Sequence, residues 1–363
     1  MSRDLIYWIA LTSIKALGPL RIKNLLDAFG SPGDVFRAPE KDLTSVDGIG
    51  AMTAAAIKEF DNWKRAEAIL RMCDGLGIKV IHLSDPGYPL LLKEVGDCPF
   101  ILYVKGDISE EDRFAIAVVG PRKPTEYGKR VADMLAGELS LSGLTIVSGM
   151  ARGIDTVAHV AALKRGGRTF AVLGSGIDVP YPPENAGLMK RIERDGAVIT
   201  EFPPGTKPER ENFPMRNRII SGLSLGVLVV EATDDSGALI TSRSALEQGR
   251  EVFAVPGMIT SDRSSGTNTL IKSGAVLVEG ARDIIEEIAP QLRGFIREKK
   301  RQEVELTKDE RSVVSMLSPE PRHIDELARQ STVPTHRLLG VLTELELKGV
   351  VRQFEGKRFG LEV

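Results

Sequence analysis

Residues 114–147 read FAIAVVGPRKPTEYGKRVADMLAGELSLSGLTIV, and this stretch decides the fold. Two short apolar runs, Phe114–Val119 and Leu144–Val147, flank an amphipathic stretch, Tyr127–Leu141. Short runs of valine, isoleucine and leucine without alternation are typical of strands that are buried on both faces. Because the stretch between them has the length of a helix, the sequence predicts a strand–helix–strand unit of a parallel sheet.

The same pattern continues through the centre of the chain. Further apolar runs of strand length lie at Thr169–Leu173, Ala197–Thr200, Val227–Val230, Val252–Val255 and Ala275–Val278. Amphipathic stretches such as Ile154–Lys164 and Leu239–Gln248 separate most of them. Repeated units of this kind predict an α/β fold with a Rossmann-like, doubly wound, mostly parallel sheet. Val80–Val104 is expected to extend the sheet, which gives a central domain over residues 80–290.

Residues 1–79 read as helical, with short loops rich in glycine and proline. The loops Leu17–Leu20 (LGPL) and Val46–Gly50 (VDGIG) each precede a helical stretch, Arg21–Phe29 and Ala51–Phe60. This is the helix-hairpin-helix pattern, in which a glycine turn that opens a helix points backbone N–H groups at a phosphate. A small helical bundle whose glycines only permit tight turns fits the same residues. DNA contact by this region is therefore left open.

The end of the chain divides into a charged linker, residues 291–305, and a compact tail, residues 306–363. In the tail, Thr307 is expected to cap a first helix through Leu317. Two more helices are expected at His323–Gln330 and Pro334–Lys348, before a β-hairpin at Val350–Leu361. Three helices and a hairpin predict a winged-helix domain. Its charges balance, which argues against strong duplex binding, so a protein-interaction role is at least as well supported as DNA contact.

Composition sets limits on function. The chain has 363 residues and a formal net charge of −2, so any affinity for phosphate must come from local clustering of basic residues. Its two cysteines, Cys73 and Cys98, belong to no CxxC motif. A disulfide framework is excluded and a metal site is not expected, which fits a reducing cytosol. No apolar run approaches membrane length, and the N-terminus lacks the features of a signal peptide, so a cytoplasmic protein is expected.

Loops that follow the strands carry the candidate binding residues. In a doubly wound sheet these loops meet at the carboxyl edge, where ligands bind beside helix N-termini. Glycines there permit close backbone approach, while serines and arginines donate hydrogen bonds to anions. The candidates in these loops are Gly120, Arg122, Lys123, Ser148, Gly149, Arg152, Gly174, Ser236 and Gly237. Their convergence predicts a phosphate-binding surface.

The sharpest segment is residues 207–218, KPERENFPMRNR. It combines basic residues with one aromatic residue, which is how proteins hold single-stranded nucleic acid: cations follow the backbone and an aromatic ring stacks on a base. The candidates here are Lys207, Arg210, Phe213, Arg216, Asn217 and Arg218. Arg122, Arg152, Arg210 and Arg216 are expected to neutralise phosphates and Phe213 to stack. A core position for Phe213, or inward ion pairs of Arg216 and Arg218, would also fit.

Enzymatic motifs are weak. The loop after the first strand lacks the GxGxxG fingerprint, and there is no Walker A sequence, so no nucleotide cofactor is predicted. Asp155 and His159 lie four residues apart on one expected helix face, but no third metal ligand follows at a suitable spacing. Ser148 lacks the frame of a nucleophile elbow. No catalytic residue is predicted.

These loops also carry a resemblance to a known family. The sequence resembles the bacterial DNA-processing protein A family, also called DprA or Smf, over nearly its whole length. The matching segments are Val118–Arg122, Ser148–Asp155 with Ala158-His159, Gly167–Gly174, Tyr181-Pro182, Asn212–Ile220, Ser236–Thr241, Gly249–Val252, Val255–Gly257 and Gly266–Ile271. The flanking regions look like the N-terminal sterile-alpha-motif-like (SAM-like) domain and the C-terminal winged helix of that family.

The resemblance implies a non-catalytic homodimer that binds single-stranded DNA, protects incoming strands during natural transformation and helps to load RecA. It assigns phosphate contact to Arg122, a cation to Arg210 and stacking to Phe213. Pro121 departs from the family, in which serine or threonine is more usual, and the lost hydroxyl and N–H would weaken phosphate capture by that loop.

Two rival functions remain. Related folds include nucleotide phosphoribohydrolases, and such an enzyme would depend on Asp155 or Glu231, although fold alone does not fix function. A transcriptional regulator would instead read duplex DNA through the winged helix.

Overall fold

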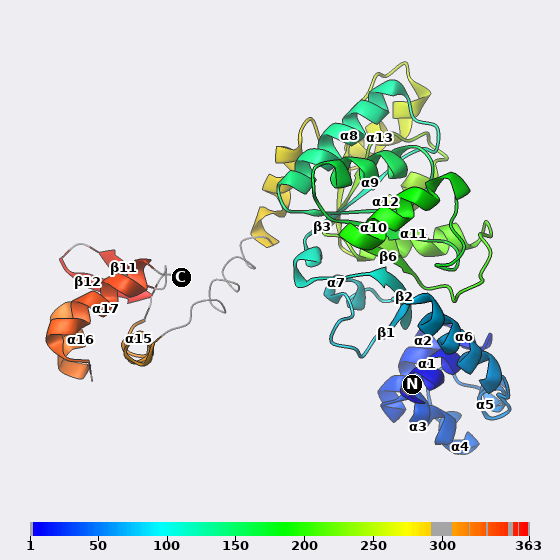
Figure 1. Cartoon of the computed structure of the whole chain (residues 1–363), viewed down its shortest axis with the longest axis horizontal. Helices are drawn as coiled ribbons and strands as arrows, with labels where there is room; N and C mark the ends of the chain where they lie inside the picture. Colours follow the sequence, from blue (N-terminus) through cyan, green and yellow to red (C-terminus); the bar gives the residue numbers. More distant parts are fainter. Residues whose placement is uncertain are drawn as a thin grey trace. The chain divides into compact units, whose positions relative to one another are not determined.

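The computed structural model describes residues 3–291, 307–318, 320–331, 333–347, 351–354 and 356–361. The chain divides into two compact units, Met1–Glu287 and Ile288–Val363, and each is described by itself (Figure 1). The predicted linker lies outside the described residues, apart from residue 291, which is helical together with residues 281–290. None of the described helices is long and apolar enough to cross a membrane.

The first unit is built on a sheet that, within the described residues, has nine strands in the order β1-β2-β6-β5-β4-β3-β7-β8-β9. The strands are β1 (Lys79–His82), β2 (Ile101–Gly106), β3 (Ala115–Val119), β4 (Thr145–Ser148), β5 (Thr169–Val172), β6 (Gly196–Thr200), β7 (Gly226–Val229), β8 (Glu251–Ala254) and β9 (Val276–Leu277). Strands β3 to β9 are parallel to one another, whereas β2 pairs with the edge of this set, β6, in antiparallel fashion and β1 pairs antiparallel with β2. The prediction of a doubly wound, mostly parallel sheet with an extension over Val80–Val104 is confirmed.

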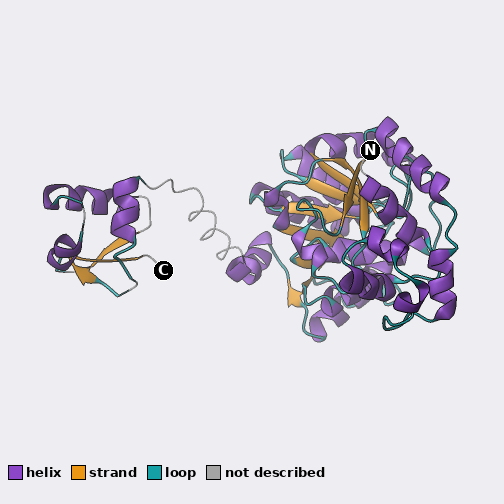
Figure 2. Ribbon diagram, turned by 90° about the horizontal axis from the view of Figure 1, so that it is seen from below, coloured by secondary structure: helices purple, strands orange, loops and turns teal. Residues whose placement is uncertain are grey.

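Helices cover both faces of this sheet (Figure 2). They are α7 (Leu90–Lys93), α8 (Glu126–Leu141), α9 (Ile154–Lys164), α10 (Ala186–Asp195), α11 (Asn212–Gly222), α12 (Gly237–Glu247) and α13 (Asp262–Lys272), with the short 3-10 helices η1 (Glu110–Arg113) and η2 (Pro183–Asn185). Two successive residues of β5 show that a hydrophobic core lies on each face of the sheet. Phe170 packs in the core that contains Ile219 of α11, whereas Ala171 packs in the core that contains Ile192 of α10. Burial on both faces explains why these strands are apolar throughout.

The N-terminal helices precede β1. They are α1 (Arg3–Ser13), α2 (Pro19–Phe29), α3 (Pro32–Arg37), α4 (Glu40–Leu43), α5 (Ala51–Lys58) and α6 (Trp63–Leu76). Helices α2 and α5 begin directly after Gly18 and Gly50, as the helix-hairpin-helix pattern predicted. Neither glycine has a side chain to cap the helix, so the first backbone N–H groups of both helices keep no side-chain partner from their N-cap residue.

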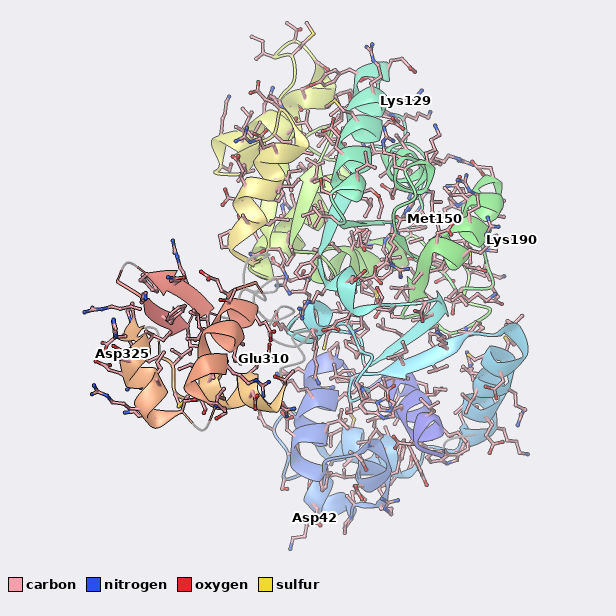
Figure 3. All side chains as sticks on the ribbon, turned by 60° about the vertical axis from the view of Figure 1, so that its left-hand side comes forward. Asp42, Lys129, Met150, Lys190, Glu310 and Asp325 are labelled. Carbon is pink, nitrogen blue, oxygen red and sulfur yellow. The ribbon has the colours of Figure 1, made fainter. Side chains whose placement is uncertain are left out.

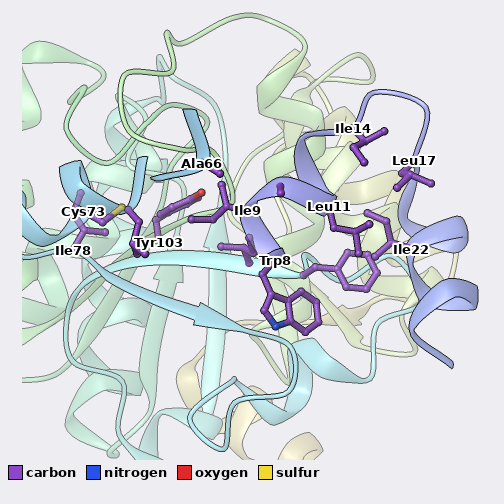
Figure 4. Packing of buried hydrophobic residues seen from close by; sticks show 14 of the residues in the cluster. Trp8, Ile9, Leu11, Ile14, Leu17, Ile22, Ala66, Cys73, Ile78 and Tyr103 are labelled. Atoms are coloured by element: carbon purple, nitrogen blue, oxygen red, sulfur yellow. The ribbon is translucent and has the colours of Figure 1, made fainter. Parts of the chain in front are cut away.

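These helices share a hydrophobic core with the sheet (Figure 4). Trp8 and Leu11 of α1 and Cys73 of α6 belong to the same buried cluster as Ile101 and Tyr103 of β2. The helices therefore give way to strands at residue 79, but the side chains on both sides of this position belong to one hydrophobic core.

The second unit has a core of its own. Its elements are α15 (Lys308–Val314), β10 (Arg322–His323), α16 (Ile324–Gln330), α17 (Thr335–Leu347), β11 (Val351–Phe354) and β12 (Arg358–Leu361). The strands form an antiparallel sheet in the order β10-β12-β11. Thr307 caps α15 in a capping box with Glu310, whose carboxylate accepts the Thr307 N–H at 2.6 Å. The predicted winged-helix arrangement is confirmed.

Candidate nucleic-acid interface

The loops that follow β3, β4 and β5 meet at the carboxyl edge of the sheet and, with the start of α11, form a pocket. Its lining combines two arginines, two aromatic rings and glycine backbone: Arg122, Gly149, Ala151, Arg152, Gly174, Ser175, Tyr181, Pro182 and Phe213. Figure 3 labels Met150, which lies in the loop between β4 and α9. Five of the predicted site residues are thus brought together: Arg122, Gly149, Arg152, Gly174 and Phe213.

Phe213 is the centre of the pocket. The guanidinium carbon of Arg122 lies 5.2 Å from the centre of its ring, and the ring of Tyr181 lies 5.7 Å away at an interplanar angle of 41°. Gly174 leaves room for Phe213, because a Cβ at that position would lie 2.9 Å from the Phe213 Cδ1 atom. The ring is half-buried and faces cations, so it offers a stacking surface beside positive charge.

Arg216 lies behind this ring and is buried, with 5% of its surface exposed. Its Nη1 donates to the carbonyl oxygen of Gly149, in the loop after β4, and to that of Val172, at the end of β5. These two hydrogen bonds tie the loop to the strand. Burial lowers the pKa of Arg216 to about 10, and the nearby Asp155 carboxyl acts against this shift. That Arg216 neutralises a phosphate stays a prediction, and in this structure the guanidinium is hydrogen-bonded inside the protein.

Asp155 and His159 form the remainder of this buried group. Asp155 accepts the Ala151 N–H at 3.2 Å, and burial raises the pKa of its carboxyl while Arg216 opposes that shift. His159 Nδ1 lies 2.7 Å from the Thr169 hydroxyl oxygen, and burial lowers the pKa of the imidazole to about 3. Asp155 thus supports the loop between β4 and α9 from inside, whereas His159 links α9 to β5.

The first loop, residues 120–125, presents two exposed cations. Arg122 and Lys123 form no ion pair with any residue that the structure describes. The end of the loop is fixed by Thr125, which caps α8 by accepting the Gly128 N–H at 3.0 Å. Glu231, which is buried, accepts both the N–H and the hydroxyl of Thr125. Pro121 contributes its carbonyl, which accepts the Ile154 N–H at 3.3 Å.

Arg152 is exposed and is paired with Glu184 of η2, a residue that sequence reasoning did not select. Lys207 and Arg210 are also exposed, and within the described part of the chain neither forms an ion pair. Their segment is held by Asn212, whose side-chain amide donates to the Gly174 carbonyl at 3.1 Å and to the Lys207 carbonyl at 3.2 Å.

The other predicted residues do not line the pocket. Arg218 forms ion pairs with Glu201 and with Asp97. This agrees with the second interpretation of its sequence position, an inward ion pair in place of a contact with DNA. Asn217 accepts a hydrogen bond from Arg216, and Ser148 is buried and donates to the Val118 carbonyl at 2.7 Å.

Three more predicted residues also lie outside the pocket lining. Ser236 caps α12 by accepting the Ala238 N–H, and Gly237 begins that helix. Gly120 lies against Ile154, where a Cβ would come within 2.5 Å of that side chain.

Tyr181 was the clearest omission from the predicted site. The Tyr181-Pro182 pair carries part of the family resemblance, but no basic residue stands beside it in the sequence to indicate a binding site. Among the described residues, no group of three histidine, cysteine, aspartate or glutamate side chains could hold a metal ion. Cys73 and Cys98 are both buried and unpaired with each other.

Together these features define a class of protein: a doubly wound α/β unit with a cationic and aromatic pocket at its carboxyl edge, in a chain that ends in a winged helix. Comparison with known families then places the chain. Residues 79–289 match the family of DNA recombination-mediator protein A, residues 297–357 the DprA winged helix domain, and residues 9–60 a SAM-like helix-hairpin-helix tandem. The chain belongs to the DNA-processing protein A (DprA/Smf) family.

Individual relatives agree with this assignment. DNA processing protein DprA of Bacillus subtilis is 46% identical over 213 residues, which are 58% of this chain and 72% of that protein. Protein Smf of Escherichia coli is 41% identical over 279 residues, 74% of each chain.

Two solved structures are also similar. The X-ray structure of DNA processing protein A from Streptococcus pneumoniae is 35% identical, with a TM-score of 0.68 over 79% of this chain and 98% of that chain. DNA processing protein A from Helicobacter pylori, described for its single-stranded DNA binding mode, is 29% identical, with a TM-score of 0.53 over 59% of this chain and 97% of that chain.

Proposed function

We propose that this protein binds single-stranded DNA at the pocket around Phe213 and does so without catalysing a reaction. The observation that carries the proposal is the position of the Arg122 guanidinium, 5.2 Å from the centre of the Phe213 ring at the carboxyl edge of the sheet. A cation beside a stacking ring matches the two needs of single-strand binding, since every nucleotide brings both a phosphate and an aromatic base.

In this mechanism, the exposed cations around the pocket neutralise successive phosphates: Arg122, Lys123, Arg152, Lys207 and Arg210. Phe213 stacks on a base, with Tyr181 beside it. The backbone at Gly149 and Gly174 allows the strand to approach closely. Arg216 supports this surface from behind, because it ties the loop after β4 to β5. Affinity then falls with rising salt and depends little on base identity.

The single-stranded DNA binding mode described for the Helicobacter pylori relative supports this ligand. The buried groups support the absence of catalysis. Asp155 and Glu231 accept hydrogen bonds from loop residues, His159 is hydrogen-bonded to Thr169 of β5, and none of the three lines the pocket. A nucleotide hydrolase would need at least one such group facing its substrate.

Membership of the family supports four further proposals. We expect a homodimer in the cytoplasm that protects incoming single strands during natural transformation and helps to load RecA. Light scattering of the purified protein tests the dimer, and a strand-exchange assay in which RecA must displace a single-strand-binding protein tests loading. A monomer at micromolar concentration, or RecA activity that does not respond to the protein, would contradict these expectations.

The first experiment measures binding of fluorescent oligo-dT across a salt series, for the natural chain and for Arg122→Ala and Phe213→Ala. Arg122→Ala should lower the slope of log affinity against log salt by about 1, and Phe213→Ala should weaken binding by about 1–3 kcal/mol. Arg311→Ala, an exposed arginine of the second unit, is the matched control. Equal binding by all four proteins would remove the pocket as the DNA site, and release of free base from nucleoside monophosphates would support an enzyme instead.

A further inference from the structure

The winged-helix unit contains a second combination of cations and an aromatic ring, on the open face of its sheet. In the pairing of β11 with β12, Val351 lies opposite Leu361, and Gln353 lies opposite Phe359. Val351 and Phe359 are buried in the core with α17. Because successive side chains of a strand point to opposite faces, the residues between them point away from that core.

Three of those residues form what we call the wing face: Arg352, Phe354 and Arg358. Phe354 lies opposite Arg358 in the register, and Arg352 lies opposite Gly360, which has no side chain to cover it. All three wing-face side chains are exposed, Phe354 to 37%. The guanidinium carbon of Arg352 lies 5.7 Å from the centre of the Phe354 ring. Among the described residues, neither arginine has an ion-pair partner.

The helix that reads duplex DNA in many winged-helix proteins has the opposite character here. Helix α17 exposes Glu344 and Glu346, and its one arginine, Arg337, is paired with Asp309 of α15 at 3.2 Å. A helix with this charge would repel the phosphates on both sides of a major groove. The start of α16, where Figure 3 labels Asp325, adds no positive charge.

We propose that the wing face is a second contact site for single-stranded DNA, in addition to the pocket around Phe213. Phe354 stacks on a base, while Arg352 and Arg358 neutralise the adjoining phosphates. A sheet face suits a single strand, whose bases can be turned outward to stack on an exposed ring, whereas the paired bases of a duplex cannot reach it. One chain would then hold one strand at two places, which raises its affinity for long strands more than for short ones.

Phe354→Trp in the full chain places a fluorescent side chain on the wing face, and its emission reports directly on stacking. A base that stacks on the new tryptophan should quench its emission when oligo-dT of about 40 nucleotides is added, a length that exceeds one binding site of about 4–16 nucleotides. The natural chain, with the buried Trp8 and the part-buried Trp63, gives the background. If the emission does not respond to the oligonucleotide, the proposal is overturned. The remaining interpretation is then that the wing face binds a protein. Stronger quenching by a duplex of equal length also overturns it.

Affinity supplies the second measurement, in a chain whose core pocket is disabled by Arg122→Ala and Phe213→Ala. Binding of the long oligo-dT that remains in this chain should weaken about 5- to 150-fold when Phe354→Ala is added, and should be unchanged by Arg337→Ala. No remaining binding, or equal loss with Arg337→Ala, contradicts the wing-face site. Binding of an oligo-dT of about 8 nucleotides, which fills one site, to the Phe354→Ala chain tests the core pocket alone, so failure of this inference and failure of the proposed function are told apart.

Discussion

The guanidinium carbon of Arg216 lies 5.9 Å from the centre of the Phe213 ring, on the protein side of the pocket. Two residues in one turn of α11 therefore have different roles. Phe213 lines the pocket, and Arg216 donates hydrogen bonds to the carbonyl groups of Gly149 and Val172 behind it. The pocket surface proposed for DNA therefore rests on a cation that is buried behind it.

Arg216→Gln should weaken oligo-dT binding without changing its salt dependence. The glutamine has no charge and cannot replace the guanidinium Nη1 that donates to the Gly149 and Val172 carbonyls, so the loop after β4 loses its tie to β5. A residue that contacts phosphate changes the salt slope by about 1 when it is removed, and Arg122→Ala provides that comparison. If the slope falls equally in both variants, Arg216 contacts phosphate in the complex.

Residue spacing contained a signal for the burial of Arg216. Residues three and four apart share a helix face, and Arg216 stands three and four residues before Ile219 and Ile220, both buried. Sequence reasoning instead grouped the arginines of this segment by composition. No local pattern could reveal the inward pairing of Arg218, because Asp97 and Glu201 come from distant segments that only the folded sheet brings together.

The parallel strands β3 to β9 were predictable to within one residue at each end. Burial on both faces leaves an apolar run that few other elements produce, as β3 shows, where all five residues are buried. The meeting of Arg122 with Phe213 followed from the rule that strand ends gather at one edge. Tyr181 was missed because its importance comes from its distance to Phe213, which the sequence does not encode locally.

Gly174→Ala should weaken single-strand binding. The added methyl carbon would lie 2.9 Å from the Phe213 Cδ1 atom, so the ring must move from its place beside Arg122. Gly187→Ala is the matched control, because a Cβ at that position of α10 meets no atom within 4 Å. A titration with oligo-dT checks both proteins, and equal affinity would mean that the position of the ring is unimportant for binding.

Glu184→Gln should increase the affinity for oligo-dT and its salt dependence. In the unbound protein Arg152 is paired with this carboxylate, so a phosphate has to compete for the guanidinium. Neutralising Glu184 frees Arg152 for the strand. Glu138→Gln, an exposed position of α8, makes the same change of net charge away from the pocket. If both variants gain affinity equally, the effect is one of overall charge and Arg152 is not a DNA contact.

Stability should fall below neutral pH because of His159. The pKa of His159 in the folded protein is lowered to about 3 by burial, against an ordinary value of 6.5. Above about pH 6.5 neither state is protonated at this residue, and below it only the unfolded chain gains the proton. The free energy of unfolding is then lost by up to about 1.4 kcal/mol for each pH unit as the pH falls from about 6.5 toward about 3.

His159→Asn isolates this contribution. The asparagine amide can still donate to the Thr169 hydroxyl oxygen, which donates its own proton to the Ile146 carbonyl at 2.6 Å. Urea unfolding of both proteins between about pH 7.5 and about pH 5 should show a steeper loss for the natural chain. Parallel curves would mean that His159 takes up a proton without unfolding. The raised pKa of Asp155 acts in the opposite direction but is common to both proteins.

The core shared by the N-terminal helices and the sheet limits how this chain can change. Trp8 and Cys73 pack with Ile101 and Tyr103, so removal of residues 1–78 would uncover a wide apolar surface on β2 and its neighbours. A helix-hairpin-helix region taken from another family member would have to match that surface side chain by side chain. The two parts are therefore expected to be inherited together and to accumulate paired substitutions, whereas the winged-helix unit, which has its own core, can be exchanged without that constraint.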